Sequence, residues 1–110
     1  MEYVRMSERA HGDSEPLLRL ARMLRDDARR YDDAALWMRR VLRTALAPAL
    51  DAQVGRELAE LLLYRSDEPR RAAPELARLA HQHRCTPIGE WAAAELTVLK
   101  ERIRAAELAE

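Results

Sequence analysis

The hydrophobic pattern of this chain repeats itself after 38 residues. Seven apolar positions are matched by seven later ones, and four of the pairs are identical: Leu20, Ala21, Leu24, Ala34, Met38, Val41 and Leu42 correspond to Leu58, Ala59, Leu62, Ala72, Leu76, Leu79 and Ala80. Within each copy the spacing is that of a helix with one buried face. A repeat of this length predicts stacked helix hairpins, because each hairpin must bury its apolar face against a neighbour.

Length and composition restrict the class of protein. A chain of 110 residues predicts one domain, over 13–110, without room for a second folded unit. Nineteen basic residues balance nineteen acidic ones, so the overall field does not attract nucleic acid or an anionic membrane surface. The hydrophobic fraction of 48% and charged fraction of 35% suit amphipathic helices. With Cys85 as the single cysteine, an internal disulfide is excluded, and the absence of a long apolar run predicts a soluble, cytoplasmic protein.

Prolines, aspartates and caps divide the chain into about five predicted helices. These cover residues 15–28, 34–46, 52–65, 69–83 and 86–108, and residues 1–12 are expected to be flexible or briefly helical. Pro48 is expected to close the second helix, and Asp51 to cap the third. Pro74 allows two alternatives, since it either kinks the fourth helix or starts the regular helix after a preliminary turn over 69–73.

The predicted fold is therefore all-α, with antiparallel hairpins over 14–48 and 49–85 and a terminal helix over 86–108. That last helix has an apolar face and no sixth helix to pair with. We expect it to cover the last hairpin, because an uncovered apolar face would promote association.

The spacing of large and small residues resembles that of tetratricopeptide repeats. Leu-Ala-Arg-Met-Leu at 20–24 is similar to the family's large-then-small pair, and Tyr31-Asp32-Asp33-Ala34 to its aromatic-x-x-alanine motif. The second copy matches more loosely, and Pro69 stands where the aromatic residue is expected. The usual glycine is absent from both copies, since Arg22 and Glu60 follow the small alanines. Each unit is also about four residues longer than the family's 34. A looser relative or an unrelated hairpin array remains an alternative.

The resemblance implies a concave groove lined by the first helix of each hairpin. Its candidate residues are Leu18, Arg22, Arg25, Asp26, Arg56, Glu60, Leu63 and Tyr64. Such a groove would hold an extended peptide or a helix of another protein, with arginines supplying charge-assisted hydrogen bonds and Tyr64 supplying buried area. The alternative is that the arginines form a solvated helix face and that Leu63 belongs to the core.

The two tryptophans differ in their expected role. Trp91 lies among apolar neighbours at core spacing, whereas Trp37 lies one step off its apolar stripe. We therefore expect Trp91 in the core and Trp37 at a surface for self-association, which makes a homodimer or oligomer the alternative function.

No constellation in the sequence predicts catalysis. His81, His83 and Cys85 lie close together in sequence but lack an evident fourth ligand, and the glycines at 12, 55 and 89 stand alone. The sequence thus predicts a non-enzymatic interaction module without metal or cofactor. A nucleic-acid-associated regulator is the lower alternative, in which arginine pairs such as Arg39-Arg40 would cluster.

Overall fold

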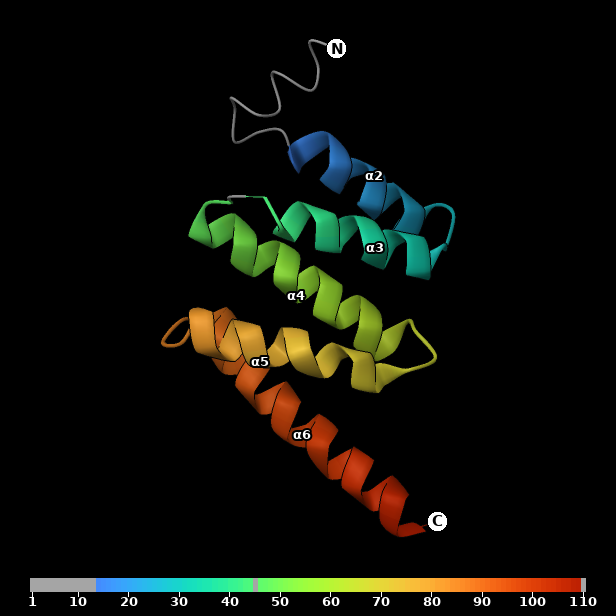
Figure 1. Ribbon diagram of the computed structural model, residues 1–110, viewed down its shortest axis with the longest axis vertical. Coiled ribbons are helices and arrows are strands. Elements are labelled where there is room, and N and C mark those ends of the chain that lie inside the picture. The colour runs from blue at the N-terminus through green and yellow to red at the C-terminus, as the bar shows by residue number, and fades with distance from the viewer. Residues whose placement is uncertain (1–13, 45, 110) are drawn as a thin grey trace. The chain divides into compact units, whose positions relative to one another are not determined.

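The computed structural model describes residues 14–44 and 46–109, and every regular element in these ranges is helical. As Figure 1 shows, the order is α2 (Ser14–Asp26), α3 (Tyr31–Leu42), α4 (Pro48–Tyr64), η2 (Pro69–Ala72, a 3₁₀ helix), α5 (Ala73–Gln82) and α6 (Pro87–Ala109). The prediction of an all-α fold with five α-helices is confirmed. The expected segment over 1–12 lies outside the described residues, as does Ala45.

The chain divides into two compact units, Met1–Val54 and Gly55–Glu110. In the first, α2 packs against α3. Small side chains let the two helices approach closely, and apolar ones fill the remaining space. The buried apolar residues of this unit are Leu18, Ala21, Ala34, Ala35, Met38, Val41, Ala52 and Val54.

A left-handed residue ends α2 and turns the chain toward α3. Arg29 has a φ of 52°, and the N–H of Arg30 donates to the carbonyl oxygen of Leu24 at 2.8 Å. Glycine normally takes such a position because a Cβ is disfavoured there. The sequence contains no glycine at this turn, and the predicted helix end at 28 is two residues too late.

Pro48 opens α4 and does not close α3, which corrects the sequence interpretation. α3 ends at Leu42, where the Thr44 hydroxyl donates to the Val41 carbonyl oxygen at 2.6 Å. Proline is compatible with the first turn of a helix, where its missing N–H is not needed. The N–H of Asp51 already donates to the Ala47 carbonyl oxygen, so Asp51 lies inside the first turn of α4 and is not its cap.

The second unit consists of the C-terminal part of α4 with η2, α5 and α6. Gly55 permits a close approach of α4 to α5, since a Cβ at this position would lie 2.6 Å from Cδ2 of Leu79. α5 packs against α6, the next helix in the chain. Apolar side chains from all four elements are buried in this unit: Leu58, Ala59, Leu61, Leu62, Ala72, Leu76, Leu79, Ala92 and Leu99.

The two alternatives at Pro74 are resolved in favour of a preliminary turn. Pro69 begins the 3₁₀ helix η2, and α5 starts at Ala73 with Pro74 in its first turn. Ser66 orders the approach, because its oxygen accepts a hydrogen bond from the N–H of Glu68 and its hydroxyl donates to the Leu62 carbonyl oxygen. Neither proline therefore interrupts a regular helix.

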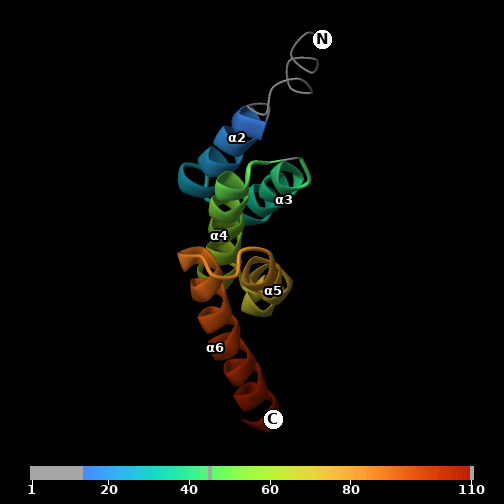
Figure 2. The same cartoon turned by 90° about the vertical axis from the view of Figure 1, so that its left-hand side faces the viewer.

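α6 begins at Pro87 behind the predicted cap. The Thr86 oxygen accepts a hydrogen bond from the N–H of Gly89 at 3.1 Å, as an N-cap does. Gly89 is required by packing, since a Cβ there would lie 2.0 Å from the carbonyl oxygen of His83. With 23 residues against 10, α6 runs well past the end of α5 (Figure 2). Its C-terminal part is consequently not covered by α5.

Candidate partner-binding site

Four of the predicted groove residues lie on α2 in the first unit. Leu18 is buried, with 4% of its surface exposed, so it presents no surface to a partner. Arg22 is half-buried. Arg25 and Asp26 pair with each other through two hydrogen bonds, from Nε to Oδ1 at 2.6 Å and from Nη2 to Oδ2 at 2.8 Å. These two charges largely compensate one another.

The other four lie on the part of α4 that belongs to the second unit. Arg56 stacks over the ring of Trp91, with its guanidinium carbon 4.8 Å from the ring centroid, and its Nε lies 3.5 Å from Oε1 of Glu60. A cation over the face of tryptophan is an attractive arrangement. Trp91 is half-buried, so the prediction of a core position was wrong. The stacking contact links it to α4 as well as to its own helix.

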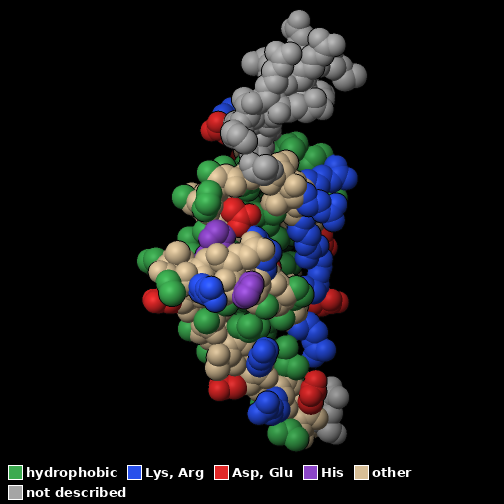
Figure 3. Space-filling view, turned by 60° about the vertical axis from the view of Figure 1, so that its left-hand side comes forward, with side chains coloured by type: hydrophobic (Ala, Val, Ile, Leu, Met, Phe, Trp, Pro, Cys, Tyr) green, Lys and Arg blue, Asp and Glu red, His purple; other side chains and the backbone are tan. Residues whose placement is uncertain are grey.

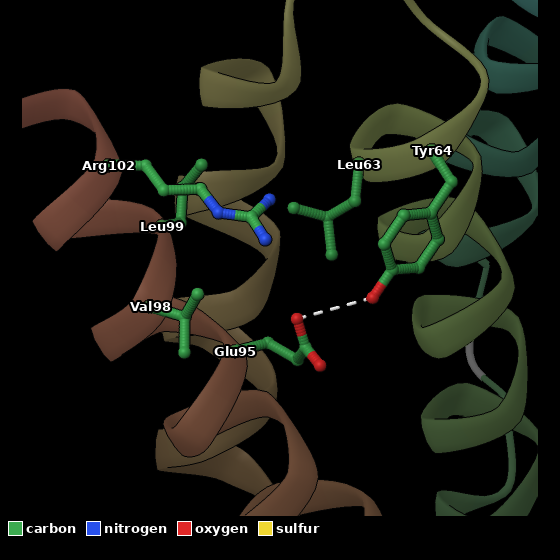
Figure 4. A pocket seen from close by; sticks show the side chains of 6 residues that line it. All are labelled: Leu63, Tyr64, Glu95, Val98, Leu99 and Arg102. Atoms are coloured by element: carbon green, nitrogen blue, oxygen red, sulfur yellow. Dashed lines mark hydrogen bonds between the residues drawn. The ribbon is translucent and has the colours of Figure 1, made fainter. Parts of the chain in front are cut away.

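Leu63 and Tyr64 open into a hollow between the end of α4 and the middle of α6. Figure 4 shows the lining residues, which also include Glu95, Val98, Leu99 and Arg102. The hollow has a volume of about 160 Å³. This is close to the cavities of about 150 Å³ that accommodate one benzene-sized group.

Two of the lining side chains expose apolar surface that is normally covered. Tyr64 is 58% exposed and Val98 is 42% exposed, although each is large and predominantly apolar. Leu63 is half-buried and Leu99 forms a buried wall. Single exposed apolar residues are common, but a hollow lined by several is typical of a contact surface.

The tyrosine is held in place by α6. Its hydroxyl donates a hydrogen bond to Oε2 of Glu95 at 3.2 Å (Figure 4). Partial burial raises the pKa of Tyr64 above its ordinary 10.0, and the negative charge of Glu95 raises it further. The phenol therefore stays protonated near neutral pH and acts as a hydrogen-bond donor.

The residues that α6 contributes were not predicted from the sequence, which assigned this helix a covering role only. Two signals could have identified them. Val98 lies beside Leu99 and extends the apolar surface to a second side of the helix, and Glu95 and Arg102 are spaced two turns apart on that side.

Trp37 lies on α3, away from these residues in the sequence and in the other unit. It is half-buried, and the guanidinium carbon of Arg40 lies 4.7 Å from its ring centroid. Its neighbour Leu36 is 46% exposed. The arginine thus covers part of the ring that was expected to be accessible.

The described residues show neither a metal cluster nor a membrane helix. Within 14–44 and 46–109, His, Cys, Asp and Glu do not gather in groups of three or more suited to a metal ion. Cys85 is exposed with a φ of 66°, and His83 is half-buried. Over the same ranges, no helix combines the length and the apolar character that spanning a bilayer requires.

Charges of both signs occupy the exposed end of α6. In Figure 3 basic and acidic side chains alternate with apolar ones near the C-terminal end of the described chain. This part of the surface therefore has no single-signed field of the kind that attracts a polyanion.

Comparison with known proteins identified no similar protein. No family model matches the sequence, no curated protein matches it, and no solved structure matches the fold. The resemblance to tetratricopeptide repeats stays a prediction.

Proposed function

We propose that this chain is a non-enzymatic interaction module, built of helical hairpins like those of tetratricopeptide proteins, that holds a segment of another polypeptide. The binding site is the hollow lined by Leu63, Tyr64, Glu95, Val98, Leu99 and Arg102, hereafter the α4–α6 hollow. Of the eight residues predicted to line the groove, this site retains Leu63 and Tyr64, and its other lining residues come from α6.

The observation that carries the proposal is the joint exposure of Tyr64 and Val98 in one concave place. Covering apolar surface contributes about 25 cal/mol per Å². Aromatic side chains in well-packed pockets commonly dominate the energy of protein interfaces. The hydrogen bond from Tyr64 to Glu95 fixes the ring before a partner arrives, so less conformational freedom is lost on binding.

The chemistry of the hollow supports binding over catalysis. Tyr64 has a raised pKa and donates its proton to a hydrogen bond, so it is not prepared to act as a base. Arg102 offers a positive charge, which can orient a ligand. These properties fit recognition of a polypeptide without chemical change.

A display experiment tests the proposal. Random peptides displayed on phage are selected on the immobilised wild-type protein. The affinity of the enriched peptides is then measured for wild type and for Val98→Asp. We expect enriched peptides to bind Val98→Asp at least about tenfold more weakly, the equivalent of about 1.4 kcal/mol. The matched control is Thr97→Asp, an exposed neighbour that does not line the hollow. Selected peptides that bind wild type and Val98→Asp equally would contradict the proposal.

Self-association is the second candidate, and Leu36 is the observation that favours it. Its side chain is 46% exposed, and it directly precedes Trp37 in α3. Light scattering after size exclusion separates the two candidates. A dimer that dissociates in Leu36→Asp would favour self-association through α3, whereas a monomer at all concentrations would count against it.

A further inference from the structure

The two charged residues of the α4–α6 hollow differ in their contacts with the rest of the protein. Glu95 accepts a hydrogen bond from Tyr64, whereas Arg102 is exposed to solvent and takes part in none of the ion pairs among the described residues. The guanidinium group of Arg102 nevertheless points into the hollow, toward Leu63 and the tyrosine ring (Figure 4). A charged donor aimed at an open apolar place favours a ligand that supplies a negative acceptor.

The two charges also give the hollow a direction. Glu95, Val98 and Arg102 follow one another at intervals of three and four residues on one side of α6. Seven residues of helix separate the charges by about 10 Å along the axis, at 1.5 Å per residue. A negative group is therefore repelled at the Glu95 end and attracted at the Arg102 end.

We propose that the occupant of the hollow is a helical segment of a partner protein that carries a large aliphatic residue and, one turn further on, an Asp or Glu. The aliphatic side chain fills the space beside Leu63 and Val98, and the carboxylate pairs with Arg102. This inference rests on the proposed function, and it specifies the chemistry of the partner.

Size and spacing support this assignment. The volume of about 160 Å³ accommodates one side-chain-sized group. Residues four apart on a helix have Cβ atoms about 6 Å from each other, which matches the separation of Val98 and Arg102 on α6. Arginine pairs with carboxylates through two parallel hydrogen bonds, a geometry that a lysine in the same place would not reproduce.

The test uses labelled helical peptides of about 16 residues, long enough to form a helix in an alanine-rich sequence. One peptide carries Leu and Glu four positions apart, a second carries Leu and Gln, and a third carries Leu and Lys. Binding is followed by fluorescence anisotropy at low salt. We expect the Leu–Glu peptide to bind at least about tenfold more tightly than the Leu–Gln peptide, since charged hydrogen bonds contribute about 1.5–3 kcal/mol.

Variants on α6 locate the effect. Arg102→Gln should abolish the preference for Glu over Gln, and Arg102→Glu should transfer it to the Lys peptide. Arg104→Gln is the matched control, because Arg104 is exposed on the same helix, does not line the hollow and changes the net charge equally. Circular dichroism confirms that each variant stays helical.

The possible failures are distinguishable. Equal binding of the Glu and Gln peptides by wild type, or loss of the preference in Arg104→Gln, would overturn this inference. If peptides selected by display bind through Val98 and the Leu–Glu peptide does not bind, the inference fails and the proposed function stands. If neither kind of peptide binds, both are overturned.

Discussion

The second helix of each hydrophobic repeat begins differently. In the first copy the helix starts directly as an α-helix at Tyr31, with Asp32 and Asp33 in its first turn. In the second copy the equivalent position is Pro69, which opens a 3₁₀ turn, and the α-helix begins at Ala73. The local backbone therefore follows the prolines and not the repeat.

Several buried positions nevertheless coincide in the two copies. Four equivalent pairs have no measurable exposure: Ala21 with Ala59, Ala34 with Ala72, Met38 with Leu76, and Val41 with Leu79. The spacing of apolar side chains thus determines which face is buried, whereas prolines affect only the first turn. Burial is the more robust property of the repeat.

Truncation of the buried pair Met38 and Leu76 should have the largest effect. Met38→Ala and Leu76→Ala are each expected to lower the free energy of unfolding by about 2–5 kcal/mol, through lost apolar contact and the cavity left behind. Urea unfolding followed by circular dichroism measures this. Leu36→Ala, at a largely exposed position, should change it by about 0.5 kcal/mol or less. A strong effect in one copy and a negligible one in the other would break the equivalence.

Gly55 marks a place where the copies differ in packing. Its counterpart in the first copy is Leu17, which is half-buried, whereas a Cβ at Gly55 would meet Leu79. Gly55→Leu should therefore destabilise the protein by about 1–3 kcal/mol through overpacking. Thermal unfolding provides the measurement, with Leu17→Ala as the comparison in the other copy. An unchanged midpoint in Gly55→Leu would show that α4 and α5 do not pack closely there.

The turns before the second helices differ at Arg29 and Asp67. Arg29 has a positive φ, and the equivalent Asp67 does not. Arg29→Gly should raise the free energy of unfolding by about 0.5–1 kcal/mol, because glycine adopts this conformation without strain. Asp67→Gly should not stabilise, since glycine there only increases the freedom of the unfolded chain. Equal changes in the two variants would contradict the assigned difference between the turns.

The ends of the first helices differ most subtly. Asp26 pairs with Arg25 in one copy, and the equivalent Tyr64 bonds Glu95 in the other. Because the folded pKa of Tyr64 lies above 10.0, the protonated phenol stabilises the fold below pH 10, and this contribution is lost as the pH rises through the folded value. Phenolate absorbance should show a late-titrating tyrosine that is missing in Tyr64→Phe. Loss in Tyr64→Phe of a tyrosine that titrates at or below pH 10 would contradict it.

The sequence was sufficient for the helices and their buried faces. Apolar spacing predicted all five α-helices, and Thr86 with Pro87 identified the start of α6. Pro48 was misread because proline ends one helix as readily as it begins the next. The left-handed Arg29 and Cys85 gave no signal, since neither is glycine.

The candidate site was predictable only in its α4 half. Leu63 and Tyr64 followed from the resemblance to known repeats, whereas Val98 and Arg102 reach the hollow through the packing of α6. Which side of a long amphipathic helix meets which neighbour depends on tertiary structure. That Arg102 lines the hollow likewise emerges only when the surrounding side chains are placed.

The α4–α6 hollow is tested most directly by mapping amide chemical shifts during titration with a display-selected peptide. We expect the changes to concentrate at Leu63, Tyr64, Val98, Leu99 and Arg102. Changes concentrated at Leu36 and Trp37, with the α4–α6 hollow unaffected, would contradict it.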